Sequence, residues 1–225
     1  MTQNSFAIVG FDLDGTLVDS SGDLTDAVNH TLAFAGRPLL TVEQVKTMVG
    51  GGARHMLSQG LEATGGSSPE TFRPLYKRML AYYGEHLSVH TRPFPGVVAA
   101  LDQLDAMGVT VAIVTNKFED FALRLLDELG LRERFATIIG GDTLGPGLSK
   151  PNRAPIDEMI RRCGGGTAAF VGDSIYDIMA ARNAEIPGIA VSFGFLLHPV
   201  EEMGADAVID SFDALVPTLE KLSLS

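Results

Sequence analysis

Short apolar runs alternate with amphipathic stretches over most of the chain, and this alternation is what most restricts its fold. Short runs rich in β-branched residues are typical of strands that are buried on both faces. The predicted strands span residues 6–11, 109–114, 137–139, 168–171, 189–193 and 207–209. The predicted helices span residues 97–107, 118–129, 155–163, 175–184 and 212–222. Strands that alternate with helices predict an α/β protein, with a parallel sheet covered by helices on both faces.

Residues 18–92 interrupt this alternation with a helical pattern. Apolar residues recur at helical spacing from Leu24 to Ala35, and Thr41 with Gln44 has the pattern of a capping box that opens a second helix. Residues 72–83 predict a further helix, and no part of this region predicts a strand. We therefore expect a core formed by residues 1–17 and 93–225, with a small helical domain inserted at residues 18–92.

The composition limits the classes of partner and compartment. Twenty-eight acidic residues against 17 lysines and arginines give a net charge of −11, which disfavours binding to nucleic acid or to an anionic membrane. A small anionic substrate remains compatible with this charge if a metal ion and a few cations reverse the field locally. There is no apolar run long enough for a bilayer, residues 1–5 lack the basic residues of a signal peptide, and the single cysteine excludes an internal disulfide. These features predict a cytoplasmic protein.

Two carboxylates, Asp12 and Asp14, directly follow the first predicted strand. Residues two apart on a strand point to the same side, so the two side chains start from one face. Like charges at this spacing repel each other unless a cation or a shared proton relieves them. The pair is therefore the first candidate for a functional site.

Further polar residues follow other predicted strands. Ligands of open parallel sheets bind beyond the carboxyl ends of the strands, near the point where the strand order reverses. The residues expected at that edge are Asp12, Asp14, Thr115, Asn116, Lys150, Asp173, Ser174 and Asp177. Each of them alone is compatible with an ordinary cap or turn, but their convergence on one edge predicts a site.

Phosphoryl transfer is the chemistry that this set of residues fits. Asp12 can attack phosphorus and form an aspartyl-phosphate, while Asp14 protonates the leaving alkoxide and later deprotonates water. Lys150, Thr115 and Asn116 can bind the phosphate. Mg²⁺ prefers oxygen ligands of the kind that Asp12, Asp173 and a group near Asp14 supply.

In their order along the chain, four motifs resemble those of the haloacid dehalogenase-like hydrolase superfamily. They are Asp12-Leu13-Asp14-Gly15-Thr16, Thr115, Lys150-Pro151 and Gly172-Asp173-Ser174-Ile175-Tyr176-Asp177. The resemblance covers essentially the whole chain and implies a Rossmann-like core with an inserted helical cap. It also implies that Asp12 is the nucleophile and Asp14 the acid/base. Mg²⁺ would be held by Asp12, Asp173 and the backbone carbonyl of Asp14, with Asp177 close by but not a direct ligand.

Within the superfamily the chain resembles the phosphoglycolate phosphatase group. The segments that carry this resemblance are residues 50–54, 92–97 and 205–212. Physically, a glycine-rich helix start in the cap offers backbone N–H groups to an anion, and Arg54 can hold a carboxylate. Gly52, Ala53 and Arg54 are therefore the candidates for substrate specificity. Arg153 stands where the group often has proline, and Glu185 stands where it often has glycine.

Several alternatives stay open. Within the superfamily, the chain could be a phosphosugar or pyrophosphate phosphatase or a phosphosugar mutase. A phosphonate hydrolase would need a cap lysine, for which Lys46 is the candidate. A phospho-accepting signalling module combines similar residues, although such domains lack a cap and an equivalent of Asp14. For the enzyme we expect Mg²⁺ as cofactor, a small phosphorylated metabolite as partner, and a monomer or homodimer.

Overall fold

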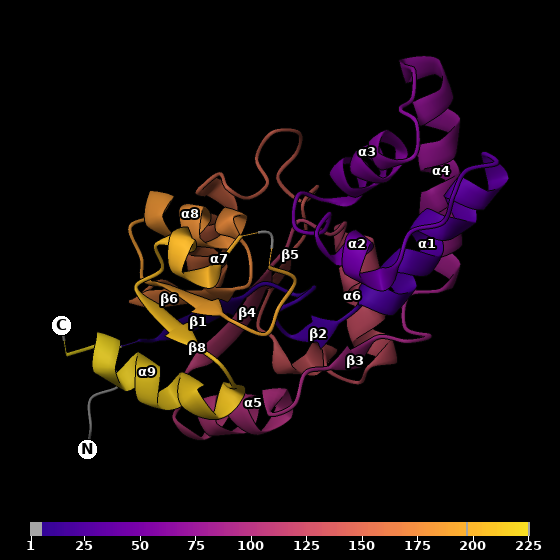
Figure 1. Cartoon of the computed structure of the whole chain (residues 1–225). Helices are drawn as coiled ribbons and strands as arrows, with labels where there is room; N and C mark the ends of the chain where they lie inside the picture. Colours follow the sequence, from indigo (N-terminus) through magenta and orange to yellow (C-terminus); the bar gives the residue numbers. More distant parts are fainter. Residues whose placement is uncertain (1–5, 197, 225) are drawn as a thin grey trace.

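The computed structural model describes residues 6–196 and 198–224, and a six-stranded parallel sheet lies at its centre (Figure 1). The strands are β1 (Ile8–Phe11), β4 (Thr110–Val114), β5 (Ile138–Ile139), β6 (Ala168–Gly172), β7 (Gly188–Val191) and β8 (Ala207–Ile209). Their order is β5-β4-β1-β6-β7-β8, so the chain moves outward from β1 on one side and then returns to the other side at β6. The order reverses beside β1, where a ligand site is expected. The predicted α/β fold with a parallel, Rossmann-like core is confirmed.

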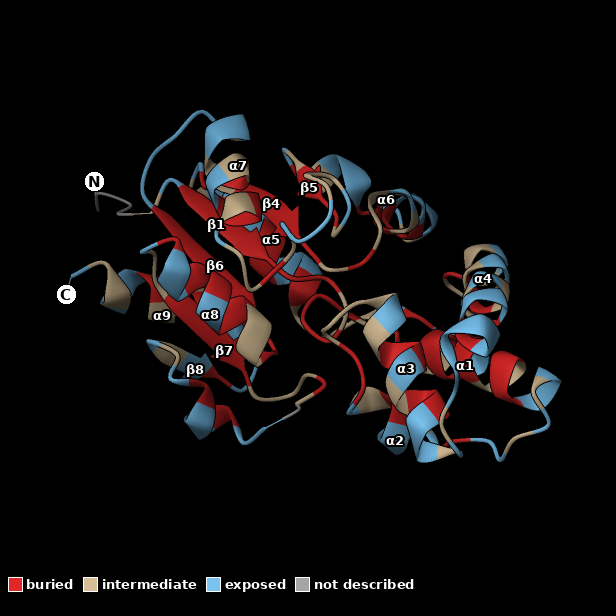
Figure 2. Cartoon of the chain, turned by 90° about the horizontal axis from the view of Figure 1, so that it is seen from above, coloured by how far each residue is buried: buried red, intermediate tan, exposed pale blue. Residues whose placement is uncertain are grey.

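Helices cover both faces of this sheet (Figure 2). Residues of β1 alternate between the faces: Ile8 belongs to the apolar cluster formed with α7 (Ala154–Arg162) and α8 (Ile175–Asn183), whereas Val9 and Phe11 belong to the cluster on the opposite face. That second cluster includes buried residues of α5 (Val97–Ala106), α6 (Glu119–Glu128) and α9 (Leu215–Leu222). Both faces of each central strand are therefore buried, as the continuous apolar runs predicted.

Four helices lie to one side of the sheet (Figure 1). They are α1 (Ser21–Phe34), α2 (Val42–Lys46), α3 (Ala53–Ala63) and α4 (Pro69–Glu85). The capping box that the sequence predicted is present at α2, where the Thr41 hydroxyl accepts from the Gln44 N–H and the Gln44 side chain accepts from the Thr41 N–H. The chain enters and leaves this helical region through β2 (Val18–Asp19) and β3 (Arg92–Pro93), which pair antiparallel.

Most element boundaries differ from the predicted ones by no more than two residues, with three larger exceptions. Helix α4 begins at Pro69, three residues before the predicted helix 72–83. The last predicted helix, 212–222, divides into a 3₁₀ turn at Phe212–Ala214 and α9. The paired strands β2 and β3 were not predicted, because two-residue segments are too short to display a period. Within the described residues no helix combines the length and the apolar character that crossing a membrane requires. Residues 1–5, used above to argue against a signal peptide, lie outside the described residues.

Candidate active site

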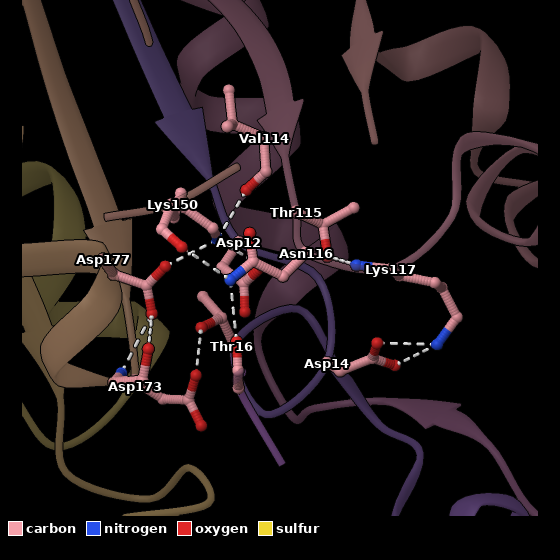
Figure 3. Close-up of polar contacts among 12 residues, drawn as sticks. Asp12, Asp14, Thr16, Val114, Thr115, Asn116, Lys117, Lys150, Asp173 and Asp177 are labelled. Atoms are coloured by element: carbon pink, nitrogen blue, oxygen red, sulfur yellow. Dashed lines mark hydrogen bonds and ion pairs between the residues drawn. The ribbon is translucent and has the colours of Figure 1, made fainter. Parts of the chain in front are cut away.

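The predicted polar residues converge at the carboxyl edge of the sheet (Figure 3). Asp12 directly follows β1, Thr115 directly follows β4, and Asp173 directly follows β6. All three are buried, with at most 6% of their surface exposed. Because β4 and β6 both pair with β1, the three side chains are brought to neighbouring positions although more than 150 residues separate the first from the last.

A buried lysine holds the carboxylate of Asp12. The Lys150 ammonium donates to Asp12 Oδ1 at 2.7 Å, to Asp177 Oδ1 at 2.6 Å and to the Val114 carbonyl at 2.7 Å (Figure 3). Burial raises the pKa of Asp12 to about 6, against the opposing effect of Lys150. Burial also disfavours the charge of Lys150, but its contacts with the two carboxylates more than offset this and raise its pKa. Because the charge of Lys150 favours the carboxylate, Asp12 is ionised near neutral pH.

Two hydrogen bonds and two closely packed glycines hold the side chain of Asp173 in place. Its Oδ2 accepts from the Phe195 N–H at 2.7 Å, and its Oδ1 from the Thr16 hydroxyl at 3.3 Å. A Cβ on Gly15 would lie 2.1 Å from Asp173 Oδ2, and one on Gly194 would lie 2.2 Å from Asp173 Cβ. The loops after β1 and β7 therefore close against this carboxylate only with glycine at both positions. Burial, followed by the charges of Asp12 and Asp177, raises the pKa of Asp173 well above its ordinary value.

The carboxylates of Asp12, Asp173 and Asp177 fit a hard divalent cation. Each offers an oxygen, and these oxygens lie within 4.8 Å of one another. Both oxygens of Asp177 already have partners, since Oδ1 accepts from Lys150 and Oδ2 from the Ser174 N–H and hydroxyl. Asp12 and Asp173 are the better donors, and an all-oxygen set of this kind suits Mg²⁺. Burial raises the pKa values of both carboxyl groups, and a cation bound between them would favour their ionised forms.

Asp14 lies beside this cluster and has a lysine of its own (Figure 3). The Lys117 ammonium contacts both of its carboxylate oxygens, and the Ser20 hydroxyl donates to its Oδ1 at 2.6 Å. Burial alone would lower the pKa of Lys117, but the charge of Asp14 more than offsets this and raises it. Sequence reasoning did not identify Lys117 or Ser20. The available signal was a lysine directly after the Thr115-Asn116 pair, at a strand end.

Thr115 and Asn116 play different parts in the geometry. The Thr115 oxygen accepts from the Lys117 N–H at 3.2 Å, which leaves its hydroxyl hydrogen for another partner. The Asn116 side-chain nitrogen donates to the Gly50 carbonyl at 2.9 Å and to the Lys150 carbonyl at 3.1 Å. The amide N–H groups of Asn116 are therefore engaged in joining the helical region to the loop that carries Lys150. Its Oδ1 is buried without a hydrogen-bond partner.

A cavity lies between these groups and the helical region. It encloses about 600 Å³, including its opening to solvent. Its polar wall contains Asp12, Asp14, Thr115, Asn116 and Lys117, and its opposite wall is mainly apolar. The residues of that wall from the helical region are Leu24, Ala27, Val49, Gly50, Gly52, Ala53, Met56, Met79, Leu80 and Tyr83. A small molecule can therefore present a phosphate to Asp12 while its other end faces the helices.

Of the predicted specificity residues, Gly52 and Ala53 line the cavity and Arg54 does not. The Arg54 guanidinium lies over the Phe72 ring, 4.8 Å from its centroid. This cation–π contact directs its charge toward α4. Lys46, the candidate for a covalent cap lysine, lies over the Phe195 ring at 5.7 Å.

The two departures from the phosphoglycolate phosphatase pattern contact each other at the surface. The guanidinium of Arg153 lies 3.6 Å from the carboxylate of Glu185 and 2.8 Å from that of Asp157. Glu185 has a φ of 61°, which explains physically why glycine is favoured there. None of these side chains approaches the cavity.

Comparison with known proteins agrees with this geometry. The model of the haloacid dehalogenase-like hydrolase family matches residues 9–191. The phosphoglycolate phosphatase of Agrobacterium fabrum is 44% identical over 94% of this chain and 92% of its own length. That of Caulobacter vibrioides is 40% identical over 92% and 87%, respectively. A crystal structure described as a predicted phosphoglycolate phosphatase from Haemophilus somnus 129PT has a TM-score of 0.89 at 29% identity, covering 96% of this chain and 99% of that one.

The chain belongs to the haloacid dehalogenase-like hydrolase family. It is an enzyme, a phosphoric monoester hydrolase similar to phosphoglycolate phosphatases.

Proposed function

We propose that this enzyme is a Mg²⁺-dependent phosphatase for small anionic phosphomonoesters, with 2-phosphoglycolate as the first candidate substrate. The observation that carries the proposal is the carboxylate of Asp12, which Lys150 holds at 2.7 Å where the cavity meets the acidic cluster. The relatives named phosphoglycolate phosphatase support the choice of substrate. The mainly apolar far wall, which offers no partners to the hydroxyl groups of a sugar, supports 2-phosphoglycolate over a sugar phosphate.

In the proposed mechanism an oxygen of Asp12 attacks phosphorus, and the ester P–O bond breaks as the aspartyl-phosphate forms. Asp14 gives a proton to the departing alkoxide and then takes one from the water that attacks the phosphoryl group. Loss of the acyl-phosphate bond releases phosphate and regenerates the Asp12 carboxylate. Lys150 and the Thr115 hydroxyl stabilise charge on the phosphoryl oxygens. Mg²⁺, held by Asp12, Asp173 and the Asp14 backbone carbonyl, would supply the remaining positive charge.

We also propose that residues 18–92 act as a cap over residues 1–17 and 93–225. The antiparallel pair β2–β3 gives two crossing points between the parts, and the Asn116–Gly50 hydrogen bond joins them across the cavity. Closure of such a cap excludes water from the reacting groups. The net charge and the single cysteine support a small phosphorylated metabolite as partner, in a cytoplasmic monomer or homodimer.

The test is release of inorganic phosphate, with and without Mg²⁺, from 2-phosphoglycolate, a hexose phosphate and pyrophosphate. We expect preference for 2-phosphoglycolate and loss of activity in Asp12→Asn and after chelation. Asp102→Asn, an exposed acid on α5, is the matched control. Release that survives both treatments would contradict the mechanism. Transfer of the phosphoryl group to a second sugar position would indicate a mutase, and a long-lived label on Asp12 a phospho-accepting module.

A further inference from the structure

Tyr83 is a buried residue at the cavity whose hydroxyl hydrogen has no acceptor among the described residues. The residue lies near the end of α4 and lines the cavity, and only 4% of its surface is exposed. The Lys117 ammonium, which can only donate, interacts with the Tyr83 oxygen, and no acceptor for the hydroxyl hydrogen lies among the described residues. A buried hydroxyl normally has a partner, and leaving one unpaired costs roughly 1–3 kcal/mol. A hydroxyl hydrogen without an acceptor, on a residue that lines a cavity, therefore points to a bond that forms with a ligand.

The ring of Tyr83 is held in place by its neighbours. The edge of Phe121 packs against it, with 5.6 Å between the ring centroids, and the Lys117 ammonium lies 4.9 Å from its centroid. Burial raises the pKa of Tyr83 to about 12, against the opposing effect of Lys117. The hydroxyl is thus protonated and able to donate throughout the neutral range.

The other polar groups on this wall are donors as well. Gly52, with a φ of 85°, precedes the first turn of α3, and both Gly52 and Ala53 line the same cavity. This helix begins without a side-chain cap or an acidic residue in its first turn, so its N-terminal N–H groups favour an anion. Apolar side chains make up most of the remaining wall, and they offer nothing to the hydroxyl groups of a sugar.

We propose that Tyr83 determines substrate specificity: its hydroxyl, together with the N-terminus of α3, binds the carboxylate of a small phosphorylated acid whose phosphate lies at Asp12. This inference rests on the proposed phosphatase function and deepens it. It assigns recognition of the substrate carboxylate to Tyr83 and the α3 backbone. It does not use Arg54, because the guanidinium of that residue lies over Phe72.

The experiment compares two substrates that differ only in the group this subsite would bind. Ethyl phosphate has a methyl group where 2-phosphoglycolate has its carboxylate. We expect the ratio of kcat/KM for 2-phosphoglycolate to that for ethyl phosphate to fall about 10- to 100-fold in Tyr83→Phe, as expected for a hydrogen bond to a charged group. Tyr82→Phe is the matched control, because this neighbouring ring stacks between His30 and His86 and does not line the cavity.

Stability separates recognition from a structural role. Tyr83→Phe removes only the interaction of the hydroxyl oxygen with Lys117, which makes no hydrogen bond of good geometry, so its Tm should stay close to that of the wild type. An unchanged substrate ratio in Tyr83→Phe, or a wild-type enzyme without preference for the carboxylated substrate, overturns the inference. Failure to release phosphate from any monoester overturns the proposed function instead. Calorimetric binding of 2-phosphoglycolate then still decides: tenfold weaker binding to Asp12→Asn/Tyr83→Phe than to Asp12→Asn supports the subsite, and equal binding overturns it.

Discussion

The ammonium group of Lys117 contacts both carboxylate oxygens of Asp14, at 2.7 and 2.6 Å. The side chains are 4% and 11% exposed, so solvent screens this ion pair little. The pair joins the loop after β1 to the loop after β4, and it lies at the proposed acid/base. Lys117 therefore orients the carboxylate that we propose as the acid/base.

The first prediction concerns Lys117→Met, which keeps the length of the side chain and removes its charge. Loss of the orienting contact should lower kcat about 100-fold, within the range that general acid–base catalysis contributes. KM should change much less, because the groups proposed to stabilise the phosphate charge, Lys150 and Thr115, remain. Steady-state kinetics on 2-phosphoglycolate measure both values. An unchanged kcat would remove Lys117 from the mechanism.

A milder change tests the second contact of Asp14. Ser20→Ala removes a hydrogen bond of 2.6 Å to Asp14 Oδ1, and a bond to a charged group of this kind should lower kcat about tenfold. Ser21→Ala is the matched control, because the neighbouring hydroxyl donates at 2.6 Å to Asp19 instead. Equal kinetic effects of the two substitutions would show that the segment, and not its contact with Asp14, matters for the reaction.

The sequence predicts the groups at the sheet edge better than it predicts their partners. Asp12, Thr115, Lys150 and Asp173 each follow a strand, and the parallel sheet brings all strand ends of this kind to one edge. Such an inference requires only the order of elements. The pairing of Lys117 with Asp14 depends on the path of two loops after neighbouring strands, and no local periodicity reports that path.

Arg54 and Tyr83 illustrate the same limit within the helical region. A glycine-rich helix start followed by an arginine predicts an anion site, but in the structure two aromatic residues of α4 receive that guanidinium. Tyr83 is the reverse case, because an aromatic residue at helical spacing predicts a position in the core and no contact with a ligand. Its ring is indeed in the core, and only the packing of α4 against α6 shows that the residue also lines the cavity.

Lys150→Met should be strongly destabilising as well as inactive. The substitution leaves Asp12 and Asp177 buried without their shared cation, and removal of one partner of a buried ion pair costs about 3–5 kcal/mol. Urea denaturation of the metal-free protein measures the loss. Arg153→Met, which removes an exposed ion pair with Asp157 on α7, should leave stability nearly unchanged. Similar losses in both variants would contradict the account of Lys150.

Asp12→Asn should be inactive yet fully folded. The pKa of Asp12 is about 6 in the folded protein against 3.8 as its ordinary value, so the folded state binds the proton more tightly than the unfolded state. Ionisation of Asp12 therefore lowers stability as pH rises from about 4 through 6, by up to about 3 kcal/mol. In the presence of a chelator, the free energy of unfolding of the wild type should fall more over this pH range than that of Asp12→Asn. Parallel pH dependences in urea denaturation would contradict the raised pKa.

The last prediction links Mg²⁺ to the same protons. Because burial raises the pKa values of Asp12 and Asp173, protons compete with the cation for these oxygens as pH falls toward 6 and below. Calorimetric titration should show the apparent Mg²⁺ affinity decreasing below about pH 6, by up to about tenfold per pH unit for each proton displaced. Asp173→Asn should lose Mg²⁺ binding, whereas Glu158→Gln, a surface acid paired with Arg161 and Arg162, should retain it. Mg²⁺ affinity that is independent of pH between 5 and 7.5 would show that the cation binds away from these two carboxylates.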